Sequence, residues 1–408
     1  MIFLKATGIV VEYNPFHNGH LHHLQLSKRI SNADAVIAVM SGNFLQRGEP
    51  ALVDKWTRAK MALLAGVDII VELPYAFATQ NAKTFAFGAI SILEALRCES
   101  FCFGSESGDL DAFMYTVNEL QHQNVAYEKE ISKNIAEGMS YPSALSAAFK
   151  TLHFTKPAID LSQPNNILGY HYIDAKQRMG ASIRPLTIQR TQAGYHDEAF
   201  NSSSIASATS IRKALKEHSF SIKKVERFIP KGTAQELHSS IHEYGQLVGW
   251  EDFWPLLQYK LLTTNKEDLS LIYEMEEGVH HRIMDKMTTS NSFFELMENV
   301  KTKRYTWTRI QRMLLHTLTN TTKEEMNKDY PSYIRLLGMS DIGRQYLNNI
   351  KKDIELPLIS KLSSVKKEDI AIDIRASRLY ALGYKSPSAQ QKLLAKDYSQ
   401  PPLYVNKS

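Results

Sequence analysis

Near its start the chain carries the segment Gly8-Ile9-Val10-Val11-Glu12-Tyr13-Asn14-Pro15-Phe16-His17-Asn18-Gly19-His20, which indicates both a fold and a site. Its first residues, up to Val11, form a β-branched run typical of a buried strand, and a helical pattern follows at Leu21–Ile30. A strand followed by a helix is the repeating unit of a parallel α/β sheet. Ligands of such sheets bind beyond the carboxyl ends of the strands, where this segment places its two histidines.

The same alternation continues through the first half of the chain. Further strand-like runs lie at Ala35–Met40, Asp68–Leu73, Ser100–Phe103 and Ile183–Ile188. Helical patterns lie at Thr57–Ala65 and Lys83–Leu96. Apolar strands separated by helices predict a parallel sheet that is covered on both faces. We therefore expect residues 1–215 to form an α/β domain built on this parallel sheet.

The hydrophobic pattern of the sequence changes from about residue 215 onward. Long amphipathic stretches follow at Trp250–Leu262, Leu269–Met287, Thr306–Thr317 and Ser332–Gly338. Strand-like runs become sparse, so these stretches favour helices. We expect residues 216–408 to form a mainly α-helical second domain.

The composition excludes several classes of protein. Of the 408 residues, 43% are hydrophobic and 22% charged, which is typical of a globular chain of about two domains. The two cysteines, Cys98 and Cys102, are too few for a disulfide framework and too isolated for a zinc site. The chain lacks a signal-peptide layout, and its longest apolar stretch, Phe85–Leu93, is too short to span a membrane. We expect a cytoplasmic protein with no membrane partner.

The histidine pair is the strongest chemical signal. His17 and His20 flank Gly19, a residue that lets the backbone approach a ligand closely. At a helix N-terminus, imidazoles can bind the phosphates of a nucleotide and stabilise charge at an α-phosphate under attack. The alternatives are a helix cap, a surface residue or a metal site that also uses His22 and His23. No acidic or thiol partner lies adjacent, so we expect no metal here.

A second element, Ser207-Ala208-Thr209-Ser210-Ile211-Arg212, places hydroxyls before an arginine at the start of a helical pattern. Such groups suit the β- and γ-phosphates of ATP, which makes Ser207, Thr209 and Arg212 candidate phosphate contacts. Taken alone, the element would be interpreted as a helix cap. The sequence contains no P-loop and no Gly-x-Gly-x-x-Gly motif, so those nucleotide folds are unsupported.

The His-x-Gly-His signature after the first strand resembles the nucleotidyltransferase superfamily that also contains class I aminoacyl-tRNA synthetases. Further runs narrow the resemblance to the bacterial tRNA(Met) cytidine acetate ligases. These runs are Val39-Met40-Ser41-Gly42-Asn43-Phe44-Leu45-Gln46-Arg47-Gly48-Glu49-Pro50, Phe103-Gly104-Ser105-Glu106 and Gln163-Pro164-Asn165-Asn166-Ile167-Leu168-Gly169-Tyr170. The matching segments span the first half in order, whereas the second half matches more loosely.

The resemblance implies an enzyme that activates acetate with ATP as acetyl-adenylate. It then transfers the acetyl group to the exocyclic amine (N4) of the wobble cytidine of elongator tRNA(Met). By the family pattern, the ATP-binding segment corresponds to Val10, Val11, Glu12, Tyr13, Asn14, Pro15, Phe16, His17, Asn18, Gly19, His20, Leu21, His22 and His23. Three further nucleotide contacts correspond to Gly104, Asn165 and Arg190. The sequence does not show whether magnesium accompanies the ATP.

These residue types suit that chemistry. Gly104 would let an adenosine lie against the backbone, Asn165 offers a donor and an acceptor, and Arg190 matches a phosphate or carboxylate. Acetate is already ionised at neutral pH, so the first step needs charge stabilisation by His17 and His20 rather than a base. The base that deprotonates the cytidine amine is not identifiable. Candidates for lining the acyl or base pocket are Gln46, Arg47, Asp54 and Lys55.

A basic run in the second half suggests a nucleic-acid partner. Residues 1–215 hold 19 basic and 19 acidic residues, whereas 216–408 hold 29 and 24, so the net charge of +5 lies in the second half. Between Lys301 and Arg312 there are five basic residues, no acid and two aromatics, a pattern suited to phosphate contacts and base stacking. The candidate tRNA contacts are Lys301, Lys303, Arg304, Arg309 and Arg312. A solvated helix face is the alternative interpretation. A looser basic group contains Lys223, Lys224, Arg227 and Lys231.

Two other functions keep the same first half. The nearer one is a nucleotidyltransferase that adenylates a small metabolite without touching RNA, so that the basic run is only surface. The other is a non-catalytic RNA-binding protein with a vestigial nucleotide site. The intact histidines and Ser/Thr-Arg element argue against the latter.

Overall fold

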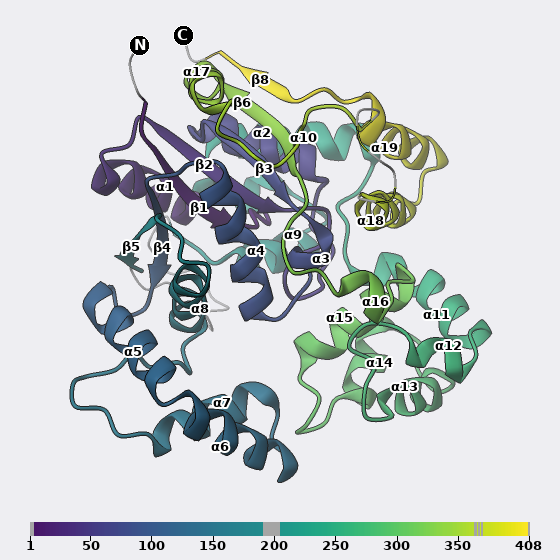
Figure 1. Ribbon diagram of the computed structural model, residues 1–408. Helices are drawn as coiled ribbons and strands as arrows, with labels where there is room; N and C mark the ends of the chain where they lie inside the picture. Colours follow the sequence, from purple (N-terminus) through teal and green to yellow (C-terminus); the bar gives the residue numbers. More distant parts are fainter. Residues whose placement is uncertain (1–3, 191–204, 363–364, 366–367, 369, 407–408) are drawn as a thin grey trace.

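The computed structural model describes residues 4–190, 205–362, 365, 368 and 370–406. Within these residues an eight-stranded sheet forms the centre of the molecule (Figure 1). The strands are Ala6–Val11 (β1), Ala35–Ser41 (β2), Ile69–Leu73 (β3), Ser100–Ser105 (β4), Arg184–Gln189 (β5), Ile334–Ser340 (β6), Leu358–Ile359 (β7) and Leu403–Val405 (β8). Their order is β5-β4-β1-β2-β3-β6-β7, with β8 paired to β6. Strands β1 to β5 run parallel, as expected, and β6 joins β3 in the antiparallel direction.

Helices cover both faces of this sheet. In the first half they are Asn18–Ser31 (α1), Lys55–Ala65 (α2), Tyr75–Ala78 (α3), Ala82–Ala95 (α4), Leu110–His122 (α5), Asn124–Ala136 (α6), Tyr141–Thr151 (α7), Pro164–Arg178 (α8) and Ala208–Glu217 (α9). The later helices are Ile222–Lys224 (η1), Glu226–Phe228 (η2), Lys231–Tyr244 (α10), Trp250–Phe253 (η3), Trp254–Thr263 (α11), Lys266–Ser270 (α12), Val279–Met287 (α13), Phe293–Val300 (α14), Trp307–Leu318 (α15), Lys323–Met326 (α16), Asp341–Ile350 (α17), Ala371–Leu382 (α18) and Pro387–Ser399 (α19).

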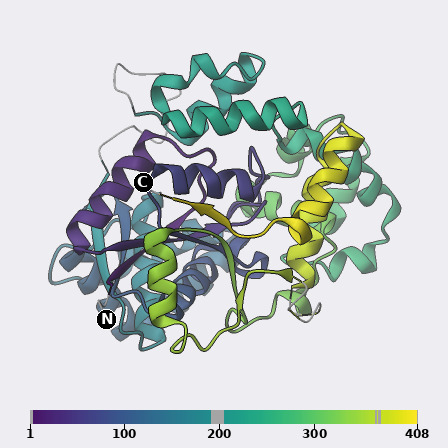
Figure 2. The same ribbon diagram turned by 90° about the horizontal axis from the view of Figure 1, so that it is seen from above.

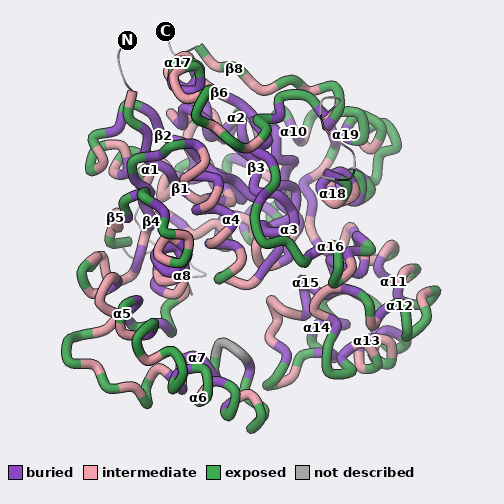
Figure 3. The backbone as a smooth tube through the Cα atoms, viewed as in Figure 1, coloured by how far each residue is buried: buried purple, intermediate pink, exposed green. Residues whose placement is uncertain are grey.

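The core lies on the two faces of the sheet. Along β2, Ile37 and Val39 point into one cluster of buried apolar side chains, while Val36 and Ala38 point into the other. Helices α4 and α8 contribute to the first cluster, and α1, α2, α9 and α10 contribute to the second. Figure 3 shows the buried residues concentrated along the sheet and these helices, whereas α6 is largely exposed. The prediction of a sheet covered on both faces is confirmed.

Two details of the expected second half are wrong. The stretch Ser332–Gly338 was expected to be helical, but it forms most of strand β6. A seven-residue apolar run buried on both faces has no periodicity that separates a strand from a helix. The stretch Leu269–Met287 is not one helix but α12 and α13, separated by a segment in which Glu274, Glu277 and Gly278 adopt left-handed φ values.

The second half is mainly helical, as expected, but it also completes the sheet of the first half. Helices α11 to α16 form a separate lobe at the lower right of Figure 1, while β6, β7 and β8 extend the central sheet. The division of the chain into two domains at residue 215 therefore stays a prediction. The separate second domain that it expects corresponds only to the helical lobe.

Four buried charges join the two halves. The Lys55 ammonium lies 2.9 Å from Glu72 and 3.0 Å from Asp397, and the Arg335 guanidinium lies 3.1 Å from Asp397. The side chains are at most 7% exposed and come from α2, β3, β6 and α19. Two cations and two anions balance one another, so the cluster is tolerated in the interior only as a complete set.

We predict that Lys55→Met lowers the free energy of unfolding by about 3–5 kcal/mol, because Glu72 and Asp397 would then share Arg335 as their one cation in this cluster, which leaves a buried negative charge unbalanced. Chemical denaturation followed by tryptophan fluorescence measures the change. The control is Lys60→Met on the same helix, since the Lys60–Glu236 pair is half exposed on the lysine side and such pairs contribute at most about 1 kcal/mol. Equal stability of the two variants would contradict the prediction.

Candidate functional site

The candidate site lies where β1 ends and α1 begins. In the loop between them Tyr13 has a left-handed φ of 52°, and the peptide bond before Pro15 is cis. Tyr13, Asn14 and Phe16 are buried and belong to the scaffold of the loop; the Oδ1 atom of Asn14, for example, accepts from the Leu52 N–H at 2.7 Å.

Arg58 of α2 anchors this loop through hydrogen bonds to main-chain carbonyls. Its fully buried guanidinium donates to the carbonyl oxygens of Glu12 at 2.7 Å, Ser41 at 3.1 Å and Val53 at 3.2 Å, and also to that of Gly42. These acceptors come from the ends of β1 and β2 and from the loop before α2. A buried cation is stable only when its donors are satisfied, so Arg58 positions these three main-chain segments together.

His17 and His20 form a stacked pair at the start of α1, with ring centroids 3.7 Å apart. His17 is the N-cap residue, and its Nδ1 atom accepts from the Gly19 N–H at 3.1 Å. The His17 N–H in turn donates to Nδ1 of His20 at 3.3 Å. Because both Nδ1 atoms accept, these partners assign the proton of each neutral ring to Nε2. The pair therefore presents two N–H donors from the first turn of a helix.

Both rings are neutral at neutral pH. Burial, together with the positive charges of Arg190 and Arg212, lowers the pKa of His17 to about 3. Burial also lowers the pKa of His20 well below its ordinary value, with contributions from His17 and Arg190. The positive charge of the site therefore comes from the two arginines and the α1 dipole, and the imidazoles act as donors.

The two arginines reach this site from separate segments. Arg212 of α9 donates from Nη1 to the Asn14 carbonyl at 3.0 Å and pairs through Nη2 with Glu49 at 3.1 Å. Arg190 follows β5, is exposed, and donates from Nη1 to Oδ1 of Asn165 at 3.4 Å. Convergence of two guanidinium groups on neutral N–H donors suits a polyphosphate.

A third group of predicted residues meets beside Arg190. A Cβ atom on Gly104, at the end of β4, would lie 3.2 Å from Cγ of Arg190, so the absent side chain makes room for the side chain of Arg190. Glu106, which carried no assigned role in the sequence analysis, accepts from the Asn165 side-chain amide at 2.7 Å and from the Asn165 and Asn166 N–H groups. Its carboxylate thus satisfies the open N-terminus of α8.

The structure distinguishes the two neighbouring asparagines. Asn166 is buried, its Oδ1 atom accepts from the N–H groups of Glu106 and Ser107, and its Nδ2 donates to the Asp160 carbonyl. Its amide is therefore fully engaged in the scaffold. Asn165 is only partly buried and lies on the side of Arg190, and its assignment as a nucleotide contact stays a prediction.

Other predicted residues have different surroundings. The Ser207 hydroxyl caps α9 by accepting from the Ser210 N–H at 3.1 Å, while Thr209 is exposed on the first turn. His22 is exposed on α1, whereas burial lowers the pKa of His23 to about 4. The structure brings Arg212 to the histidines.

The pocket-lining candidates are only partly supported. The Gln46 N–H donates to Oε1 of Glu12 at 2.9 Å, which places this loop beside the site, and Arg47 follows it in the same loop. Burial raises the pKa of Glu12. Asp54 instead caps α2 and pairs with Lys396, and Lys55 belongs to the buried charge cluster. The side chains of these two residues are therefore already engaged in the scaffold.

The arginines of the basic run are paired with a preceding acidic segment. Arg304 lies 2.7 Å from Glu277, Arg309 lies 3.5 Å from Glu276, and Arg312 lies 2.7 Å from Glu274. The Arg312 side chain is also buried. Lys301 and Lys303 are exposed. The helical pattern of the sequence does not predict these ion pairs, because the glutamates lie about thirty residues earlier in the chain than the arginines.

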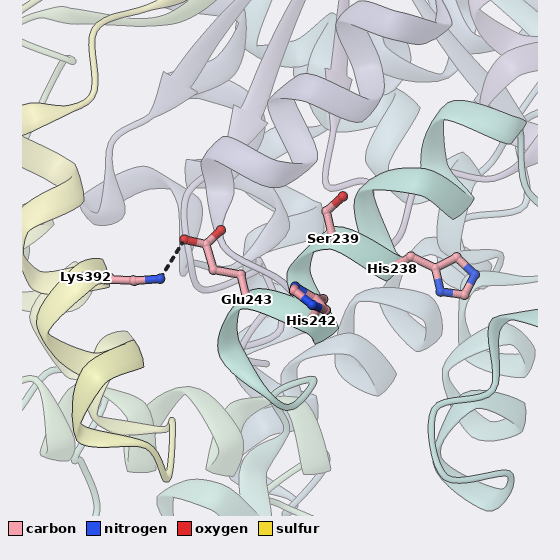
Figure 4. A pocket seen from close by; sticks show the side chains of 5 residues that line it. All are labelled: His238, Ser239, His242, Glu243 and Lys392. Atoms are coloured by element: carbon pink, nitrogen blue, oxygen red, sulfur yellow. Dashed lines mark hydrogen bonds and ion pairs between the residues drawn. The ribbon is translucent and has the colours of Figure 1, made fainter.

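A surface hollow of about 640 Å³ lies away from these residues, between α10 and α19. Figure 4 shows that its side chains do not converge: His238 points away from Glu243, which pairs with Lys392 at 3.4 Å. Among the described residues, no three histidine, cysteine, aspartate or glutamate side chains form a group able to hold a metal ion. Nor does any helix in the described ranges have the length and apolar character needed to cross a membrane.

Comparison with known proteins identifies relatives over nearly the whole chain. The family described as HIGH Nucleotidyl Transferase matches residues 4–395. The tRNA(Met) cytidine acetate ligase of Lysinibacillus sphaericus is 50% identical over 403 residues, covering 98% of this chain and 100% of that protein. The protein of the same name from Bacillus subtilis is 45% identical over 390 residues, covering 94% of each.

Two solved structures resemble this one closely. The apo structure of Thermotoga maritima TmcAL has a TM-score of 0.92 at 34% identity, covering 99% of this chain and 100% of that chain. A structure of the same protein bound with alpha-thio ATP has a TM-score of 0.89 at 33% identity, with the same coverage. Both similarities extend over the sheet and the helical lobe, because nearly every residue is covered.

We predict that the protein loses stability as the pH falls from 7 to 5.5. Burial lowers the pKa of His171 to about 4, as it lowers those of His17 and His23, so these rings stay neutral in the folded chain. In the unfolded chain they bind protons near pH 6.5, which favours unfolding by about 1 kcal/mol for each histidine over this interval.

Thermal unfolding at a series of pH values measures this effect. The variant His171→Gln should have a shallower pH dependence than the wild type, by the contribution of one histidine. An unfolding temperature that rises on acidification to pH 5.5 would contradict the prediction.

Proposed function

The chain belongs to the HIGH nucleotidyltransferases and, within them, to the tRNA(Met) cytidine acetate ligases, and we propose that it uses ATP to activate acetate and acetylates N4 of the wobble cytidine of elongator tRNA(Met). The observation that carries the proposal is the convergence of two neutral imidazole donors and two arginines at the N-terminus of α1. The TmcAL structure bound with alpha-thio ATP supports ATP as the nucleotide.

In the first step an acetate oxygen attacks the α-phosphorus of ATP. A phosphorus–oxygen bond to acetate forms, the bond to the β-phosphate oxygen breaks, and pyrophosphate leaves. The Nε2–H groups of His17 and His20 donate to the α-phosphate oxygens as their charge grows, and Arg190 and Arg212 offset the charge of the triphosphate. Acetate is ionised at neutral pH, so this step needs no general base.

The adenosine binds on the other side of the same site. We assign it to the end of β4 at Gly104, beside the Arg190 side chain, and to the amide of Asn165. Glu106 positions that amide, because it accepts from Nδ2 of Asn165 and leaves Oδ1 directed to Arg190. Glu106 is therefore a positioning residue for nucleotide binding.

In the second step the cytidine amine attacks the acetyl carbon. A carbon–nitrogen bond forms, the carbon–oxygen bond to the adenylate breaks, AMP leaves, and the amine loses one proton. Magnesium enters no step here. Glu12 and Glu49, the acidic residues of the two loops at this site, already accept from Gln46 and Arg212, so they do not form a free carboxylate pair for the ion.

The alternative, adenylation of a small metabolite without RNA, is not favoured. Relatives named tRNA(Met) cytidine acetate ligase match the chain over 94–98% of its length, including the helical lobe. A transferase for a free metabolite would have no need for a lobe of this size.

We predict that His17→Asn lowers the acetate-dependent exchange of pyrophosphate into ATP by about 10²–10³-fold, the effect of removing one donor from a site of developing charge. Asparagine is a good N-cap residue, so α1 should still form. The control is Gln25→Asn, an exposed position further along α1. Exchange close to the wild-type rate in His17→Asn would contradict the role assigned to His17.

The proposed reaction itself is tested by incubating the protein with ATP, radiolabelled acetate and elongator tRNA(Met), followed by nucleoside analysis. We expect label in N4-acetylcytidine that depends on ATP, and no label when the wobble cytidine is replaced by uridine. Label in acetyl-adenylate but not in tRNA would favour the metabolite alternative.

A further inference from the structure

In the segment after α9, an apolar buried residue recurs at every third position. This spacing leaves the basic side chains between them exposed. The two turns of this segment, η1 and η2, are 3₁₀ helices, in which residues three apart lie on the same side. The residues at this spacing are at most 2% exposed and pack into the core beneath the sheet: Ile222, Val225 and Phe228. The basic residues between them are consequently exposed: Lys223, Lys224 and Arg227.

Two more exposed lysines flank these turns, Lys216 at the end of α9 and Lys231 at the start of α10. We name the five residues the basic turn: Lys216, Lys223, Lys224, Arg227 and Lys231. Within the described part of the chain, none of the five side chains forms an ion pair with a carboxylate. The arginines of the run at 301–312 differ in this respect, because each is paired with a glutamate.

The basic turn borders the reaction site directly. The side-chain amide of Asn18, which lies between the two histidines in sequence, donates to the Arg227 carbonyl at 2.9 Å. Leu24 of α1 and Ile211 of α9 share one apolar cluster, and Figure 2 shows the teal α9–α10 segment beside the purple helix α1. The position of the turn relative to the site is therefore set by a hydrogen bond and a common core.

We propose that the basic turn binds the phosphates of the RNA substrate next to the reacting nucleotide. The inference rests on the proposed function, because a base that reaches the acyl-adenylate brings the phosphates on either side of it to the rim of the site. Because the lysines at that rim form no ion pair in the described structure, their charge is available for phosphate contacts, which release counterions. The paired arginines of 301–312 would have to break their ion pairs with glutamates before they could bind a phosphate.

The test is the charge reversal Lys223→Glu/Lys224→Glu, compared with Lys351→Glu/Lys352→Glu. The control also reverses two adjacent exposed lysines, which directly follow α17. Affinity for an unmodified transcript of elongator tRNA(Met) is measured at several salt concentrations. We expect the first variant to bind at least about tenfold more weakly and to lose about two from the slope of log K against log salt.

A neutral variant, Lys223→Gln/Lys224→Gln, should lose the same slope, which keeps the test valid if the charge reversal disturbs folding. Affinity and slope equal to those of the control variant would overturn the proposal, as would weaker binding found only in Lys303→Glu/Arg304→Glu. If the wild-type protein itself failed to bind this tRNA, the proposed function would fail, which is a different outcome from the failure of the basic turn.

Discussion

The buried guanidinium of Arg58 is the constraint on which the site depends. Parallel strands end in main-chain carbonyls that a loop must satisfy, and here one side chain satisfies those of Glu12, Ser41 and Gly42 at once. The β1–α1 loop, the β2 end and helix α2 consequently move as one unit. The histidine pair keeps its geometry because its loop has no freedom of its own, which is the preorganisation that charge stabilisation requires.

The loop after β2 extends this rigid unit to the helical lobe. Gly48 has a left-handed φ of 82°, and a Cβ atom there would lie 2.9 Å from the backbone nitrogen of Arg312. The Gln311 amide also donates to the Arg47 carbonyl at 3.0 Å. These contacts fix α15 of the helical lobe against the loop after β2, so the nucleotide site and the lobe share one frame.

Sequence reasoning succeeded where the physical signal is local. Strands β1 to β5 are apolar runs bounded by polar turns, and the two histidines are adjacent in the chain, so both could be predicted. It failed where the deciding partner is distant. Strand β6 is defined by its pairing with β3. The ion pair of Arg312 depends on Glu274, and the role of Glu106 depends on the N-terminus of α8. No pattern within a short window contains these partners.

The antiparallel pairing of β3 with β6 also constrains how the protein is made. Ile69 pairs with Met339, about 270 residues later, and a ribosome adds roughly 5–20 residues per second. For roughly 15–55 s the apolar strand β3 therefore stands at the open edge of an unfinished sheet, the kind of edge that recruits other strands. The edge of β3 meets its native partner only when β6 emerges.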